Sequence, residues 1–363
     1  MLDRLPVELL QHILRLAAPL DYTPELYEER RANLRSCCLV SQRMRELAQP
    51  MLLEVSEVKT DEDIEALETN GRGKQVKLLA YRRVRQRSSS RIYALSEHAD
   101  RLRRVLAACH LVRDVRYFDP VVDLNLLAPL SVRRVVFAGC WVDLTDAGIT
   151  LPKLEELSMD ATVMDSVEFG LLLRRCCLPA LQFFAVTGVE PSDGAAFSSA
   201  ISSGFFNSAK HIVLDAYDLA RLPPSFPLPD PSQVLLTTSR YFAPDTFAPP
   251  FKPVHLAFYP RATLEYFGSG TAGRDAIKSF LPALSQHPTV RNLGIPDCLH
   301  PKQVLPSELA SARDELLKAC ADNEVRVVWT TELTEWDSLV PHEFRAFLAE
   351  EAALREREAG ERV

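Results

Sequence analysis

The sequence predicts an α/β protein in which a small helical segment precedes a curved parallel sheet lined on its outside by helices. Three observations support this prediction. The chain opens with an amphipathic helical pattern, and a short strand pattern, apolar-x-x-apolar-x-apolar, recurs after residue 52. Helix-like stretches separate several of these strands. Strands that alternate with helices favour a parallel sheet.

Composition sets the outer limits of the prediction. The chain has 363 residues, of which 47% are apolar and 25% charged, enough for two domains or one elongated repeat architecture. A net charge of -7 gives no general reason to expect a nucleic acid or an anionic membrane as the partner. The eight cysteines include two adjacent pairs and lack C-x-x-C spacing. With no leader pattern, we expect reduced thiols in a cytoplasmic or nuclear protein.

The first predicted element is the helix in "LDRLPVELLQHILRL", residues 2–16. Charged residues interrupt it, so it fits neither a secretory leader nor a membrane span. Pro6 suits the first helical turn, where its missing N–H costs nothing. An apolar stripe follows the helical spacing, and Leu10 and Leu14 widen it. The stripe consists of Leu5, Leu9, Ile13 and Leu16.

Two more short helices are predicted before residue 52. The stretch "DYTPELYEERRAN" is polar and either loop-like or helical, and "LRSCCLVSQRMRELAQPML" carries a second apolar stripe. Ser41 is a plausible N-cap for the third helix, and Pro50 is expected to end it. The resulting helical domain covers residues 1–50.

The two blocks "LPVELLQHIL" and "LRSCCLVSQRMREL" resemble an F-box, a family whose pattern contains these residue types in this order. The matching residues are Leu5, Pro6, Glu8, Leu9, Ile13, Leu34, Leu39, Val40, Ser41, Arg43 and Leu47. Two departures stand out. The spacer is longer than usual by about the length of "PLDYTPELYEERR", which a surface loop would tolerate. Met44 stands where many members have Trp, which reduces aromatic area.

The resemblance implies the substrate-recognition subunit of an SCF (cullin-RING) E3 ubiquitin ligase, in which the F-box binds a Skp-type adaptor and, through it, cullin and RING subunits. The implied adaptor-binding residues are Leu5, Pro6, Leu9, Ile13, Leu34, Leu39, Val40, Met44 and Leu47. A simpler interpretation remains open, because the three helices could merely cap the exposed end of a repeat array.

The recurring strand pattern is clearest in "VRRVVFAGCWV", where Val132, Val135, Phe137, Cys140 and Val142 fit the leucine-rich pattern L-x-x-L-x-L-x-x-N/C-x-L. Other matches lie at 112–117, 154–164, 181–186, 209–219, 290–298 and 325–329. Helix-like stretches lie at 95–109, 164–177, 195–207, 274–286 and 307–321. The sequence therefore predicts an irregular leucine-rich-repeat horseshoe over residues 51–340.

The residues between and beside the apolar strand positions are expected to line the concave face of this sheet, where a target protein would bind. They are Asp114, Arg116, Arg134, Glu156, Ser158, Asp160, His211 and Asp215. Together they predict a mainly acidic strip that favours a target segment carrying Lys or Arg. For any single residue, a solvated sheet surface is the better interpretation.

Two regions depart from the repeat. Residues 222–260 contain ten prolines, which argues against a regular sheet throughout and favours a long packed connection. Residues 341–363 begin amphipathic and end in alternating charge, as expected of a closing helix with a charged tail.

Motifs for chemistry are weak. "GSGTAG", residues 268–273, satisfies G-x-G-x-x-G but lacks the surrounding βαβ unit, so a loop before a helix is the better interpretation. The arginine-rich "YRRVRQRSSSR", residues 81–91, is best explained as a solvated loop, and the histidines lack metal-ligand spacing. We therefore expect no enzyme, metal, cofactor, nucleic acid or membrane partner. A repeat scaffold without ubiquitin output is the alternative, and an enzyme using the glycine loop is a remote third.

Overall fold

The protein is described here from a computed structural model. The described residues are 5–18, 24–69, 71–82, 91–118, 121–138, 141–143, 148–160, 176–187, 209, 211–215, 234–237, 254–258, 262, 264–267, 271–331, 340, 343–348 and 350. The chain divides into two compact units. Unit 1 comprises residues 1–157 and 175–180, and unit 2 comprises residues 158–174 and 181–363.

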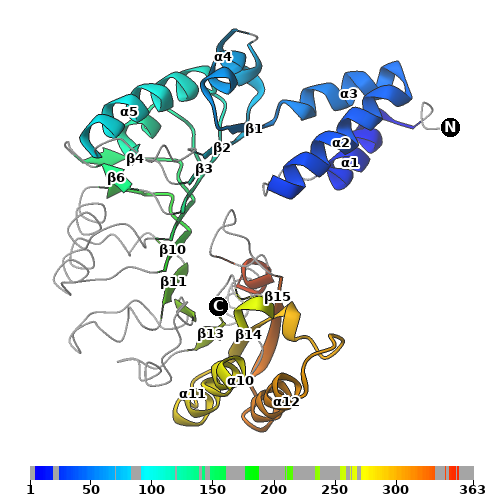
Figure 1. The fold of residues 1–363 in the computed structure, drawn as a ribbon, viewed down its shortest axis with the longest axis vertical. Helices are drawn as coiled ribbons and strands as arrows, with labels where there is room; N and C mark the ends of the chain where they lie inside the picture. Colours follow the sequence, from blue (N-terminus) through cyan, green and yellow to red (C-terminus); the bar gives the residue numbers. More distant parts are fainter. Residues whose placement is uncertain are drawn as a thin grey trace, which may run out of the picture. The chain divides into compact units, whose positions relative to one another are not determined.

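Helices lie between the strands from β1 to β3 and from β13 to β15, whereas the described elements from β3 to β13 are strands and the short 3-10 helix η3 (Figure 1). The helices are α1 (Val7–Ala17), α2 (Pro24–Val40), α3 (Gln42–Leu52), α4 (Asp61–Thr69), α5 (Arg91–Ala108), α9 (Leu264–Phe267), α10 (Thr271–Lys278), α11 (Phe280–Gln286) and α12 (Ser307–Asp322), with short 3-10 helices η2 (Arg72–Gln75), η3 (Leu124–Leu127) and η7 (Asp297–Leu299). The strands are β1 (Val55–Val58), β2 (Leu78–Arg82), β3 (Asp114–Phe118), β4 (Val121–Asp123), β5 (Arg134–Ala138), β6 (Trp141–Asp143), β7 (Ile149–Thr150), β8 (Glu156–Asp160), β9 (Cys176–Cys177), β10 (Phe183–Thr187), β11 (His211–Asp215), β12 (Val234–Thr237), β13 (His255–Ala257), β14 (Asn292–Pro296) and β15 (Arg326–Thr330).

The predicted α/β class with a parallel sheet is confirmed. Among the described strands, eleven form one sheet in the order β1-β2-β3-β5-β8-β10-β11-β12-β13-β14-β15. Within this sheet the strands lie side by side in the order in which they occur along the chain, as expected for short connections between neighbouring strands. Two smaller parallel sheets, β4 with β6 and β7 with β9, are separate from the large sheet.

The first three helices of unit 1 form a module with its own core. Leu10 and Leu14 of α1, Leu34 of α2 and Met44 of α3 are all buried in it. The stretch expected to be either loop-like or helical is helical over residues 24–33, and it continues into the second apolar stripe as the single helix α2. Pro50 does not end α3, which runs on to Leu52. Since Pro50 lies in the last turn, little of the helix remains to be broken.

In unit 1, the apolar positions of the strand pattern pack into one row. The rings of Tyr117 and Phe137 stack with centroids 5.5 Å apart, and Tyr81 meets Tyr117 edge-on at 6.4 Å. Strands β2, β3 and β5 pair in parallel without offset between these rings, so Tyr81, Tyr117 and Phe137 are directly adjacent. The sequence pattern predicted the inward position of Tyr117 and Phe137, whereas Tyr81 lies in β2, a strand that the pattern did not locate.

In unit 2, the expected long connection over residues 222–260 is wrong for its described part, because it contains strands β12 and β13. Both strands pair in parallel with their neighbours. The prolines therefore lie outside these strands, where they remove no ladder donor. The glycine motif is partly described, and its last residues already belong to α10, which begins at Thr271.

Candidate functional site

Helix α1 is apolar on two sides. Leu10 and Leu14 point into the module core, whereas Leu9, Ile13 and Leu16 remain exposed, Leu16 to 71%. A soluble helix ordinarily buries one stripe and exposes polar residues opposite it. The exposed stripe of α1 therefore lacks a covering element within the described part of the chain.

A second exposed apolar group lies where α2 passes into α3. Leu39 is 81% exposed and Val40 is 60% exposed at the last turn of α2. The chain then turns at Ser41, which is extended and caps α3 by accepting a hydrogen bond from the Met44 N–H at 3.2 Å. The predicted N-cap is thus confirmed, and the exposed Leu39 and Val40 lie directly before it, where the chain passes from α2 to α3.

Exposed apolar side chains are concentrated in this module. Of the ten large hydrophobic residues that are exposed in the described chain, seven lie within the first 40 residues: Val7, Leu9, Ile13, Leu16, Leu26, Leu39 and Val40. The other three, Leu111, Leu264 and Val304, are isolated in sequence. Grouped exposed apolar residues mark interaction surfaces, whereas scattered ones need no explanation. We call Leu9, Ile13, Leu39 and Val40 the apolar surface.

The structure narrows the expected set of adaptor contacts. Leu34 and Met44 are buried in the module core, so their side chains are not presented to a partner. Leu5 and Leu47 are half-buried against the same core, and Pro6 is exposed. The sequence could not separate the buried residues from the exposed ones, because residues three or four apart share a helix face and the sequence alone does not say which face turns inward.

Sequence reasoning missed Arg30, which holds the module together. This buried side chain donates to the carbonyls of Ala18 and, at 2.8 Å, Met51, at the ends of α1 and α3. It also approaches Glu54 Oε2 at 3.4 Å, next to strand β1. Helix C-termini leave carbonyls without intrahelical partners, and Arg30 satisfies two of them. Its place in the supposed spacer concealed this role.

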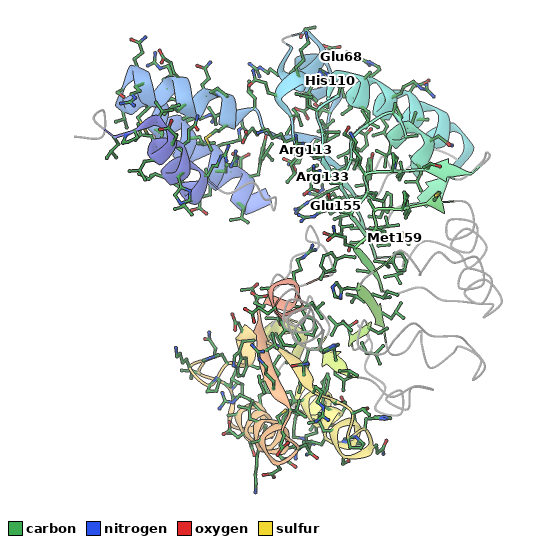
Figure 2. The ribbon with its side chains drawn as sticks, turned by 180° about the vertical axis from the view of Figure 1, so that it is seen from behind. Glu68, His110, Arg113, Arg133, Glu155 and Met159 are labelled. Carbon is green, nitrogen blue, oxygen red and sulfur yellow. The ribbon has the colours of Figure 1, made fainter. Side chains whose placement is uncertain are left out.

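The expected concave surface is partly a row of ion pairs in unit 1. Arg134 on β5 pairs with Asp114 on β3 at 3.3 Å and with Glu156 on β8 at 2.9 Å. Arg116 Nε lies 3.5 Å from Asp114 Oδ1. Figure 2 shows the adjacent row, Arg113, Arg133 and Glu155, which backbone hydrogen bonds of 2.7 Å link across the strands.

These contacts correct the prediction of an open acidic strip. Glu156, Arg116 and Ser158 are buried, and the two described acids of the row are matched by two arginines. Paired charges of opposite sign produce little long-range field. Asp160 and Asp215 lie on strands β8 and β11 as expected, but their side chains are outside the described residues.

In unit 2, a row of strand positions on the same face, two residues further along the strands, is apolar and covered. Ala185, Val213 and Leu235 pair directly across β10, β11 and β12. They form one core with four residues near the C-terminus: Val340, Phe344, Phe347 and Leu348. Predicted target residue His211 stacks on Phe183 at 5.2 Å, and the Arg345 guanidinium lies 4.9 Å from the centre of the same Phe183 ring. The helical residues 343–348 are thus the expected closing element, packed on the sheet itself.

Two of the described cysteines are deeply buried. Burial raises the pKa of Cys109 to about 12 and that of Cys320 to about 11, so both thiols stay protonated and are poor nucleophiles at neutral pH. Among the residues that the structure describes, no group of three or more histidine, cysteine, aspartate or glutamate side chains is arranged to hold a metal ion. Cys140, which fits the leucine-rich pattern, lies outside the described residues.

Within the described part of the chain, no helix combines the length and the apolar composition needed to cross a membrane.

Comparisons with known proteins show distant likeness to solved structures. No protein-family model matches the chain, and no curated protein matches it. Among solved structures, a crystal structure of a protein from Bacteroides fragilis is similar with a TM-score of 0.47 and 11% sequence identity. The match covers 88% of this chain and 86% of that chain.

Proposed function

We propose that this protein is the non-catalytic substrate-recognition subunit of an SCF (cullin-RING) ubiquitin ligase, in the cytoplasm or nucleus. In this proposal α1–α3 are an F-box that binds a Skp-type adaptor, and the parallel sheet belongs to a degenerate leucine-rich-repeat horseshoe that binds the target protein. The single observation that supports it most is the apolar surface on α1 and α2, because these side chains coincide with the F-box-like sequence blocks.

The proposal explains why these residues are exposed. Burying one large aliphatic side chain contributes about 1.5 to 3 kcal/mol, so leaving several of them in water is unfavourable unless a partner covers them. A cap for a repeat array would direct its apolar face to the neighbouring repeat. Here the core-facing residues Leu10 and Leu14 are distinct from the exposed Leu9 and Ile13 on the same helix.

The decisive experiment replaces Leu9 and Ile13 by Asp and measures co-purification with a Skp-type adaptor and cullin. Losing two apolar contacts of at least about 1.5 kcal/mol each predicts an affinity reduced by about a hundredfold or more. Both positions are exposed, so circular dichroism of the variant should match that of the unchanged chain.

A matched control is available. Leu111→Asp and Val304→Asp place the same charge at exposed apolar positions outside the module, and adaptor recovery should not change. Equal adaptor recovery by the folded double variant would refute the F-box assignment. Adaptor binding without cullin recovery or target ubiquitination would favour the scaffold alternative.

A further inference from the structure

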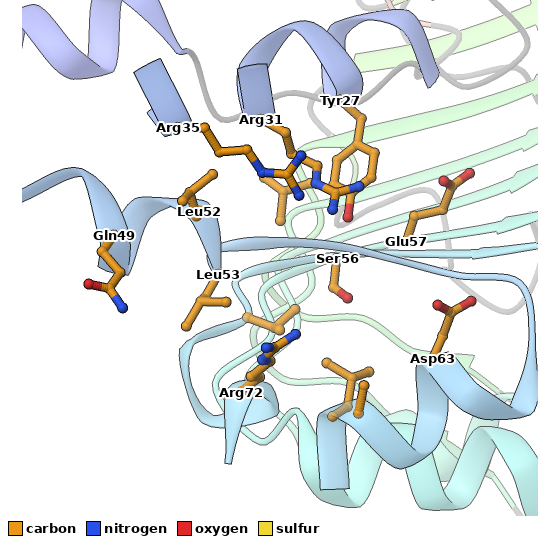
Figure 3. Close-up of a pocket in the computed structure, with 14 residues that line it drawn as sticks. Tyr27, Arg31, Arg35, Gln49, Leu52, Leu53, Ser56, Glu57, Asp63 and Arg72 are labelled. Atoms are coloured by element: carbon orange, nitrogen blue, oxygen red, sulfur yellow. The ribbon is translucent and has the colours of Figure 1, made fainter. Parts of the chain in front are cut away.

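A cavity of about 400 Å³ lies within unit 1, apart from the apolar surface. Its walls come from α2, the end of α3, strand β1, helix α4 and the 3-10 helix η2 (Figure 3). This volume lies within the range of small-molecule sites. Its floor is aliphatic and consists of Leu52, Leu53, Val55, Leu67 and Val76.

One wall is a basic stripe on α2. Tyr27, Arg31 and Arg35 follow each other at intervals of four residues and therefore share one helix face. Arg31 lies over the Tyr27 ring, with its guanidinium carbon 5.2 Å from the ring centre, and approaches Glu28 at 3.3 Å. Figure 3 shows the side chains of Arg31 and Arg35 directed into the pocket from the α2 side.

A third arginine enters from the opposite wall. Arg72 begins η2 and is preceded by Gly71, whose φ of 61° is a left-handed conformation that other residues rarely adopt. On its other side, a Cβ on Gly73 would lie 2.6 Å from the Ala108 carbonyl oxygen, so η2 packs closely on the end of α5. Two glycines thus fix the short turn that presents Arg72 to the cavity.

The acids of the cavity are already engaged. Asp63 Oδ2 accepts hydrogen bonds from the backbone N–H groups of Lys59 and Thr60, both at 2.9 Å, at the start of α4. Glu57 pairs with Lys59 at 2.6 Å. By contrast, no hydrogen bond or ion pair links the side chain of Arg35 or Arg72 to a residue that the structure describes. Because the donors to Asp63 are neutral, its carboxylate offsets part of this charge, and the two arginines on facing walls leave the balance of the cavity positive.

We propose that this cavity binds a small phosphate ester, with Arg31, Arg35 and Arg72 around the phosphate and the aliphatic floor against its organic part. Guanidinium groups match phosphate oxygens in geometry and charge, and each can donate two parallel hydrogen bonds. Cations on opposite walls suit a dianion better than a single carboxylate, which one arginine would satisfy. Ser56, which also lines the cavity, adds a neutral hydroxyl donor.

Isothermal titration of the full chain with phenyl phosphate and with inorganic phosphate, at constant ionic strength, tests the proposal. We expect one saturable site and at least tenfold tighter binding of phenyl phosphate, because its ring would cover the aliphatic floor. No saturable binding, or equal affinity for the two probes, would overturn the assignment to a phosphate ester.

Variants locate the binding in this cavity. Arg35→Gln combined with Arg72→Gln should weaken phenyl phosphate binding at least tenfold, and the Lys replacements should weaken it less because they retain the charge. Arg113→Gln removes an exposed arginine of unit 1 that does not line the cavity and should leave affinity unchanged. Unchanged binding by the double Gln variant, or equal losses in the Arg113 control, would show nonspecific charge attraction and refute the site.

Discussion

The two units fill the same face of the sheet in different ways. Beside the apolar pattern residues, unit 1 places Asp114, Arg134 and Glu156, which form a row of ion pairs. In unit 2 the same pattern position holds Phe183 and His211, whose rings stack, and the row two residues further along the strands holds Ala185, Val213 and other apolar residues, which its own C-terminal segment covers. The same repeat pattern therefore produces a row of residues that is stabilised by ion pairs in unit 1 and a row that is stabilised by burial in unit 2.

This difference teaches that strand alternation determines which residues share a face but not what that face contacts. A charged row needs partners of opposite sign, and direct register across three strands supplies them in unit 1. An apolar row needs a cover, and in unit 2 Phe344 and Phe347 provide it. Neither strip is a ready-made open surface for a target.

Reversing a buried charge in unit 1 should have the largest effect. Glu156→Lys would place a second cation beside Arg134 in a buried position, so we expect the free energy of unfolding to fall by about 5 kcal/mol. Glu155→Lys is the matched control, because the neighbouring Glu155 is exposed and its pair with Arg133 spans 3.5 Å. It should cost at most about 1 kcal/mol.

Urea unfolding of both variants measures the two values. Similar small losses for Glu156→Lys and Glu155→Lys would mean that the ion-pair row is solvated after all. The interpretation that ion pairs compensate the buried charges of unit 1 would then be wrong.

Removing the cover in unit 2 should have the next largest effect. Phe344→Ala deletes a fully buried ring that meets the edge of the His255 ring at 6.0 Å and sits close to Gly294. We expect a local loss of about 3 kcal/mol, at the low end for such a change, because a segment near a chain end can relax. Hydrogen exchange in β13 and β14 should become about a hundredfold faster.

The control for this variant is Glu350→Ala, an exposed position just beyond the same helical residues. It should leave exchange unchanged. Unaltered protection of β13 and β14 in Phe344→Ala would show that the C-terminal segment does not stabilise the apolar row of unit 2.

Much of the sheet could be predicted from the sequence, and the exceptions have a physical cause. The strand pattern located β3, β5, β8, β10, β11, β14 and β15, since their apolar residues alternate. It missed β1 and β2, and the assignment of residues 81–91 to a solvated loop was wrong for Tyr81 and Arg82, which end β2. It also missed β12 and β13, whose "VLLT" and "HLA" are short continuous apolar runs between prolines. Periodicity cannot distinguish such runs from a buried loop or helix.

The candidate sites were predicted less completely. Leu9 and Leu10 are identical in type, and only the packing of α1 against α3 decides that Leu10 is buried and Leu9 exposed. The neutral balance around Arg134 depends on strand register, which no sequence pattern specified. Arg30 lay in a stretch expected to be a spacer, so its contacts with two helix ends could not be foreseen.

The smallest effect should be one that the two units share, because it depends on burial and not on charge pairing. Burial raises the pKa of Cys109 in unit 1 to about 12 and that of Cys320 in unit 2 to about 11, above the ordinary thiol value of 9.0. Above pH 9 the unfolded chain loses these protons while the folded chain keeps them, so the free energy of unfolding decreases as pH rises. Each thiol contributes a decrease of about 1.4 kcal/mol per pH unit, which ends near pH 11 for Cys320 and near pH 12 for Cys109. Urea unfolding of Cys109→Ala and Cys320→Ala between pH 8 and 10.5 should therefore show shallower alkaline slopes than the unchanged chain, whereas replacing the exposed Cys177 by Ala should leave the slope as it is. Parallel curves for all four proteins would mean that neither thiol is excluded from water. The burial of a thiol would then not be a property that the cores of the two units share.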